Sequence, residues 1–191
     1  MALRRRGAER YNASIHAPEM RHMSTPRILT VAILVFLTLS AGACSPNVDL
    51  KKDLAVVDVT SGYFDAGIIK DPEGEKNRIL PSIAFKLKNL SKDTTIDSVQ
   101  INAVYHTVNE RDKEWGTSWV KGIGSEGLTP GQSTPLLVLR SDRGFTGLQP
   151  RMQMLQNRDF VDVVVDLMAK YRAQQYVKLG TFPITRQLLT Q

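Results

Sequence analysis

The stretch IAFKLKNLSKDTTIDSVQINAVY, residues 83–105, decides the fold because two of its segments repeat with a period of two. In 83–88 and again in 99–105, apolar side chains occupy every second position. This alternation is typical of strands that bury one face and expose the other to water. The polar run NLSKD (89–93) between them has the composition of a turn. The side chains expected to face inward are Ile83, Phe85, Leu87, Val99, Ile101, Ala103 and Tyr105.

The rest of the chain continues this pattern. Thr129-Pro130-Gly131-Gln132 fits a type II turn, and 148–158 contains a helical spacing that begins near Pro150. The sequence therefore predicts an all-β, antiparallel β-sandwich of about seven strands with one short helix, over residues 53–187. The expected strands are 54–60, 83–88, 99–105, 114–121, 134–140, 161–168 and 174–182.

Two motifs carry a resemblance to a known fold family. FKLKNLSKDTTIDSVQINAVY (85–105) combines a strand, an Asn-containing turn and a second strand, and GLTPGQSTPLLV (127–138) leads from a Pro-Gly turn into a strand. In this, the chain resembles the small immunoglobulin-like domains of many bacterial envelope proteins. The resemblance implies an immunoglobulin-like sandwich, without the Cys–Trp–Cys pattern of antibody domains, and implies no particular function.

An apolar leader precedes this region. Residues 28–39, ILTVAILVFLTL, follow Arg27 and precede small residues, which is the pattern of a secretory signal peptide. The run is shorter than the roughly 20 residues of a membrane-spanning helix. We expect residues 1–43 to be a signal peptide whose true start is Met23 or Met20. The alternative is a genuine basic extension before the apolar run.

The end of the leader holds Cys44, the only cysteine of the chain. The run LSAGAC (39–44) resembles the lipobox of bacterial lipoproteins, with Gly42 and Ala43 before the cysteine and Ala41 where leucine is usual. The resemblance implies that Cys44 receives a diacylglycerol and acyl chains such as palmitate, and becomes the mature N-terminus. Residues 44–52 would then be a lipidated tether. The alternative is a free or buried cysteine after an ordinary cleaved signal.

Charge and localisation follow from this division. The net charge is +6, but the residues before Cys44 contribute +4 of it, and the remainder is nearly balanced and interspersed. Nucleic-acid binding needs clustered positive charge, so we expect no nucleic-acid partner. Ser45 replaces the Asp that, in enteric lipoproteins, favours retention in the inner membrane. We therefore expect a lipid-anchored protein of the bacterial cell envelope, periplasmic or surface-facing, with the outer membrane favoured.

Three motifs could carry chemistry, and each has a simpler interpretation. GIGSEG (122–127) matches a dinucleotide loop, but Leu128-Thr129-Pro130-Gly131 cannot open the required helix. His106 would have to serve any Ser-His-Asp site, yet no activated serine is evident, so we expect a surface histidine. DPEGEK (71–76) could offer oxygen ligands to Ca²⁺, but it lacks the EF-hand pattern and suits a charged hairpin tip. We expect no catalytic residue, no metal site and no cofactor.

The candidate partner-binding residues are aromatic. Trp115 and Trp119 share strand parity, and Tyr63 could add to an outward patch, although core positions are the alternative. The sequence favours a non-enzymatic, membrane-anchored module that tethers an envelope protein partner or serves as an accessory subunit. The alternative is a lipoprotein that binds a glycan, lipid or metal ion in the inter-sheet space or at exposed tryptophans. A hydrolase that uses His106 is the third hypothesis.

Overall fold

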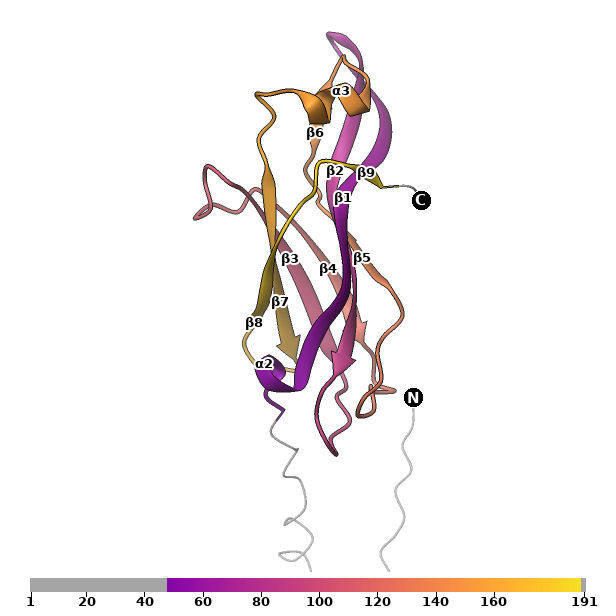
Figure 1. Ribbon diagram of the computed structural model, residues 1–191, viewed down its shortest axis with the longest axis vertical. Coiled ribbons are helices and arrows are strands. Elements are labelled where there is room, and N and C mark those ends of the chain that lie inside the picture. Colours follow the sequence, from indigo (N-terminus) through magenta and orange to yellow (C-terminus); the bar gives the residue numbers. More distant parts are fainter. Residues whose placement is uncertain (1–47, 190–191) are drawn as a thin grey trace, which may run out of the picture. The chain divides into compact units, whose positions relative to one another are not determined.

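The computed structural model describes residues 48–189, which form a sandwich of two β-sheets (Figure 1). The five-stranded sheet contains β1 (Leu54–Asp71), β2 (Gly74–Asn89), β5 (Leu137–Arg140), β6 (Phe145–Gly147) and β9 (Leu188–Leu189). The four-stranded sheet contains β3 (Val99–Thr107), β4 (Gly116–Ile123), β7 (Val163–Tyr171) and β8 (Val177–Pro183). The all-β sandwich that the sequence predicts is confirmed.

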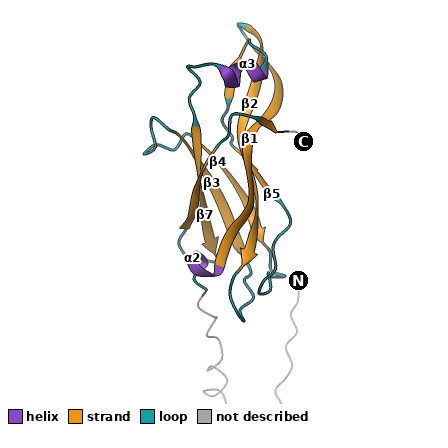
Figure 2. Cartoon of the chain, viewed as in Figure 1, coloured by secondary structure: helices purple, strands orange, loops and turns teal. Residues whose placement is uncertain are grey.

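Strand order places β2 and β3 inside their sheets. The first sheet runs β5-β2-β1-β9, with β6 also paired to β2, and the second runs β4-β3-β7-β8. All pairings are antiparallel except the short parallel contact between β1 and β9. Two short helices, α2 (Leu50–Asp53) and α3 (Arg151–Gln156), lie at opposite ends of the sandwich (Figure 2). Of these, α3 matches the helix expected within 148–158.

The core forms where the inward rows of the two sheets meet. Every second residue of β3 is buried, and β2 and β7 show the same alternation over most of their length. The seven inward positions predicted in 83–105 are all fully buried. Tyr105 also joins the sheets, because its hydroxyl donates a 2.9 Å hydrogen bond to the carbonyl oxygen of Leu139. The alternation in the sequence therefore identifies the core correctly.

The first two strands extend beyond the expected bounds. β1 and β2 form a long hairpin whose tip lies at Asp71–Gly74, so DPEGEK is a charged hairpin tip as predicted. The pairing register shifts between Val57 and Thr60 and again between Asp65 and Ile68. Such bulges interrupt the period of two, which is why the sequence predicts only residues 54–60 of β1 as a strand. The two shortest strands, β6 and β9, were not expected.

The fold begins before the predicted boundary at residue 53. Val48 and Leu50, which fall in the predicted tether, are each only 4% exposed and belong to the core. Asp49 caps α2 by accepting the N–H of Lys51, and this turn directs both apolar side chains inward. Val48 and Leu50 therefore anchor the segment before β1 to the sandwich.

A buried asparagine organises the loops at one end. The Asn89 side chain is fully buried, and its amide donates to the carbonyl oxygens of Thr94 and Leu128 at 2.9 and 2.7 Å. Its amide oxygen accepts the N–H and hydroxyl of Ser91. Asn89 thus replaces the hydrogen bonds that these backbone groups would make with water.

Candidate functional site

Cys44, the expected lipidation site, lies outside the described residues, so the structure bears on the domain that follows it. Within residues 48–189 no helix is long and apolar enough to cross a membrane. The same residues contain no group of three or more His, Cys, Asp or Glu side chains that could hold a metal ion.

Trp119 is the most exposed aromatic side chain between residues 48 and 189, with 69% of its surface accessible. It projects from β4 on the outer face of the four-stranded sheet, opposite Asn102 in the register. Beside it lies an open depression of about 460 Å³, lined by Ser98, Val99, Gln100, Trp119, Lys121 and Arg172. An exposed indole next to a hollow is a suitable anchor for a partner.

The strand that carries Trp119 has a free edge. β4 pairs only with β3, and the loop after β5 covers its first residues, where Thr117 and Asp142 exchange hydrogen bonds of 2.8 and 3.1 Å. Backbone groups of an antiparallel strand alternate in direction. The N–H and C=O groups of Trp119 and Lys121 therefore point away from β3, like those of Thr117. No other segment within residues 48–189 hydrogen-bonds to them.

The other two expected contact residues lie in an aromatic cluster inside the sandwich. Tyr63 is fully buried, and its ring makes edge contacts with Phe145 and Phe160, with centroids 6.2 and 5.3 Å apart. Trp115 stacks on Phe145 at 5.1 Å. Burial, reinforced by the negative charge of Asp162, raises the pKa of Tyr63. Tyr63 and Trp115 thus close one end of the core, and the three expected residues do not form a surface patch.

Strand parity fails at Trp115 because β4 begins at the next residue. The Trp115 N–H donates to the Tyr105 carbonyl oxygen, and the side chain turns toward Phe145 and the core. Gly116 follows, and a Cβ at that position would meet the Ser141 hydroxyl at 2.3 Å. The core interpretation therefore applies to Trp115, and the outward interpretation applies to Trp119.

His106 belongs to a polar cluster on the outer face of the four-stranded sheet. Its Nδ1 lies 2.8 Å from the Lys113 carbonyl oxygen, and its Nε2 lies 3.7 Å from Asp166. Asp166 also pairs with Lys178 at 2.7 Å and accepts from Thr181 at 2.6 Å. Partial burial raises the pKa of Asp166, but the hydrogen bonds from Lys178 and Thr181 outweigh it, and the net pKa is lowered. Both ring nitrogens of His106 therefore have neighbours that orient the ring.

The carboxylates of the hairpin tip are matched by lysines. Lys76 bridges Asp71 at 2.8 Å and Glu73 at 2.6 Å, and Lys70 pairs with Glu75 at 3.1 Å. The hydrogen bond from Lys76 lowers the pKa of both Asp71 and Glu73. Each of the three carboxylates thus pairs with one of two lysines, and the three do not converge as the ligands of one cation would.

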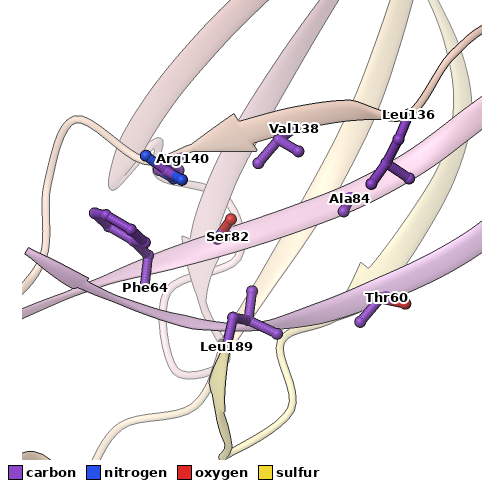
Figure 3. Close-up of a pocket in the computed structure, with 8 residues that line it drawn as sticks. All are labelled: Thr60, Phe64, Ser82, Ala84, Leu136, Val138, Arg140 and Leu189. Atoms are coloured by element: carbon purple, nitrogen blue, oxygen red, sulfur yellow. The ribbon is translucent and has the colours of Figure 1, made fainter. Parts of the chain in front are cut away.

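A groove that the sequence pattern does not predict lies on the outer face of the five-stranded sheet (Figure 3). Its volume is about 320 Å³. The lining residues come from four strands and the segment before β5: Thr60, Phe64, Ser82, Ala84, Leu136, Val138, Arg140 and Leu189. An inter-sheet pocket was the sequence-based expectation for a ligand site, whereas this groove is on the outside of the sandwich.

Comparisons with known proteins add little to this geometry. No protein-family model matches the chain. No curated protein matches it either. A solved crystal structure, that of Northeast Structural Genomics Consortium target SoR45, is similar at 15% identity and a TM-score of 0.36. The similarity covers 71% of this chain and 89% of that one, and at this level it establishes neither a family nor a function.

Proposed function

We propose that this chain is a lipid-anchored lipoprotein of a bacterial cell envelope that holds a partner protein at the membrane without catalysing a reaction. The lipobox-like run ending at Cys44 supports the anchor. The observation that carries the binding role is Trp119, which is 69% exposed on an edge strand where the outward backbone groups of Trp119 and Lys121 have no hydrogen-bond partner within residues 48–189. Tryptophan is enriched among the residues that contribute most to the free energy of protein–protein binding.

The partner binds by adding a strand to the free edge of β4. The N–H and C=O groups of Trp119 and Lys121 supply main-chain hydrogen bonds, and the Trp119 side chain supplies apolar contact. Lys121 has no ion-pair partner within residues 48–189. An acidic side chain near the added strand would complement it, so charge favours a partner segment with Asp or Glu at this position.

The lipid anchor raises the effective concentration of the domain at the membrane. Each buried methylene contributes about 0.8 kcal/mol to membrane attachment, and two or more acyl chains make that attachment stable. A domain held at the bilayer meets a membrane-bound partner at a high effective concentration, so a modest edge-strand contact suffices. Ser45 after the cysteine favours the outer membrane as the site of attachment.

Site-specific photo-crosslinking in cells tests this function. A photoreactive amino acid placed at Lys121 should yield a discrete adduct with a protein, and Trp119→Ala should abolish that adduct. The matched control places the crosslinker at Leu148, which is 73% exposed. Leu148 directly follows β6, a strand of the five-stranded sheet, whereas β4 belongs to the four-stranded sheet. Equal adducts at both positions, or an adduct that survives Trp119→Ala, would contradict the edge-strand contact.

The contribution of the anchor is tested in the same cells. Cys44→Ala should release the domain from the membrane and reduce the adduct at position 121, because the effective concentration is lost. If the adduct forms equally well with the released protein, the domain binds its partner without needing the membrane, and the tethering role is refuted.

A further inference from the structure

The groove on the five-stranded sheet exists because the outward positions at its floor carry small side chains. The pairing register places Thr60, Ala84 and Val138 in one row across β1, β2 and β5. The next row contains Gly62, Ser82 and Arg140. Larger outward side chains would fill this space, so the small residues of β1 and β2 give the groove its depth.

The walls of the groove are apolar. Leu189 lies over Gly62, since a Cβ at Gly62 would meet Leu189 Cδ2 at 2.9 Å. On the opposite side, Leu136 and Val138 remain 55% and 47% exposed. The volume of about 320 Å³ lies at the lower end of the range of about 300–1,000 Å³ that small-molecule sites occupy. Size and lining suit one narrow apolar chain.

Charge distinguishes the two ends of the groove. Arg140 is the only charged residue of the lining, and its guanidinium lies 3.6 Å from the centroid of the Phe64 ring. Figure 3 shows this pair at one end and Leu136, Ala84 and Thr60 at the other. Within residues 48–189 no carboxylate forms an ion pair with Arg140. Lys86, two residues beyond Ala84, is in contrast paired with Asp58 at 2.9 Å.

A peptide is a poor occupant for this groove. β2 is paired on both sides, with β1 and with β5, so the backbone of the floor has no free hydrogen-bonding groups. A peptide laid along it would lose water from its own N–H and C=O groups without new partners. A hydrocarbon chain has no such groups to satisfy, and it gains from every methylene that leaves water.

We propose that the groove binds a single-chain amphiphile with an anionic headgroup, a long-chain fatty acid. The acyl chain lies along β2 over Ser82 and Ala84, between Leu189 and Val138, and the carboxylate meets the Arg140 guanidinium. The Arg140 guanidinium lies over the Phe64 ring, with Cζ 3.6 Å from its centroid, and a guanidinium that packs on a ring through one face keeps N–H groups for a bidentate contact with a carboxylate. This site is on the other sheet from Trp119 and does not depend on the protein-holding role.

Photolabelling of the mature, membrane-purified protein in phosphatidylcholine vesicles tests the site. The probe is a palmitic acid analogue with a diazirine in its chain, and labelled peptides are mapped by mass spectrometry. We expect adducts on peptides that contain residues 82–84 and 136–140, and we expect unlabelled palmitate to suppress them. Adducts confined to other peptides, or insensitive to palmitate, would overturn the proposal.

Two variants separate the apolar and the charged parts of the site. Ala84→Phe fills the floor and should remove labelling, while the thermal unfolding curve stays unchanged because position 84 faces outward. Arg140→Gln should weaken competition by palmitate about tenfold, the usual size of one charge-assisted contact, and leave competition by hexadecanol unchanged.

The matched control is Arg143→Gln, an exposed arginine just after β5 that does not line the groove. It should label like the wild type. If Ala84→Phe labels normally, the chain does not lie in the groove. If Arg140→Gln affects palmitate and hexadecanol equally, or if Arg143→Gln matches its effect, Arg140 does not bind the headgroup. Either result would overturn the corresponding part of the proposal.

Discussion

The Tyr105 hydroxyl on β3 donates a 2.9 Å hydrogen bond to the Leu139 carbonyl oxygen on β5, and this bond joins the two sheets through the core. Both residues are buried, and burial raises the pKa of Tyr105, so the hydroxyl stays protonated as a donor. The Ser82 hydroxyl also donates to the same oxygen at 3.3 Å, so the carbonyl is not left without a partner if the Tyr105 hydroxyl is lost.

Tyr105→Phe should therefore lower the free energy of unfolding by about 1 kcal/mol, the net value of one buried hydrogen bond. Urea denaturation measures the change, with Tyr176→Phe as the control because Tyr176 is 39% exposed. If both variants unfold at the same urea concentration as the wild type, the bond between the sheets contributes nothing to stability.

The two tryptophans should respond differently to a quencher. Trp115 stacks on Phe145 against the core, whereas Trp119 is 69% exposed. Because the chain has only these two, Trp115→Phe and Trp119→Phe each leave a single indole. We expect iodide to quench the fluorescence of the Trp115→Phe protein strongly and that of the Trp119→Phe protein weakly. The opposite order would mean that Trp119 is not free for a partner.

Gly62 is required for the contact between β1 and the end of the chain. A Cβ at this position would meet the Gln187 carbonyl oxygen at 2.8 Å and Leu189 Cδ2 at 2.9 Å. Gly62→Ala should lower stability by about 1–3 kcal/mol, as overpacking does, and speed hydrogen exchange at 187–189. Gly147→Ala is the control, since its nearest neighbour would lie at 3.4 Å. Unchanged exchange in Gly62→Ala would contradict this packing.

Asp166 should contribute to stability at neutral pH and lose that contribution in acid. Its partial burial raises its pKa, but Lys178 and Thr181 lower it below the ordinary value of the unfolded chain. The stabilisation is therefore present above the unfolded pKa of about 3.9 and disappears as pH falls through the folded pKa. We expect Asp166→Asn to cost about 1 kcal/mol at pH 7 and little at pH 2. Chemical denaturation at both pH values measures this difference.

Asp112→Asn, in the exposed loop between β3 and β4, is the control for the acid series. Its stability should follow that of the wild type at both pH values. A difference between wild type and Asp166→Asn that stays constant from pH 7 to pH 2 would show that the side chain acts through packing and not through its charge.

The sequence predicts the centre of the sandwich well because β2, β3 and β7 are regular there. The inward-facing residues of these three strands all contact the same core. Every second residue must therefore be apolar, and this alternation is visible in the sequence. The strand pattern of β1 beyond residue 60 cannot be predicted in the same way. Asp58 and Gly67 have positive φ and lie at the two register shifts, and each shift changes which residues face the core. Tyr63 therefore lies outside the strand expected at 54–60, although it belongs to β1 and is fully buried.

The candidate sites were harder to predict because each depends on register between distant segments. Trp119 was among the expected contact residues, but Trp115 faces the core because it precedes β4, and this break in strand parity cannot be seen in the sequence. The groove could not be inferred at all, since its floor combines small residues of β1 and β2 with walls from β5 and β9. The only sign of the groove in the sequence is the small size of Thr60, Ser82 and Ala84. These residues indicate a groove only when the pairing of β1 with β2 is known.

Intact-mass and N-terminal peptide analysis of the mature protein tests the central claim, the lipid anchor, most directly. We expect a mature N-terminus at Cys44 that carries the mass of a diacylglyceryl group, and we expect the Cys44→Ala protein to lack this mass and to leave the detergent phase in a phase-separation assay. A mature chain that starts at another residue, or one with an unmodified Cys44 thiol, would contradict it.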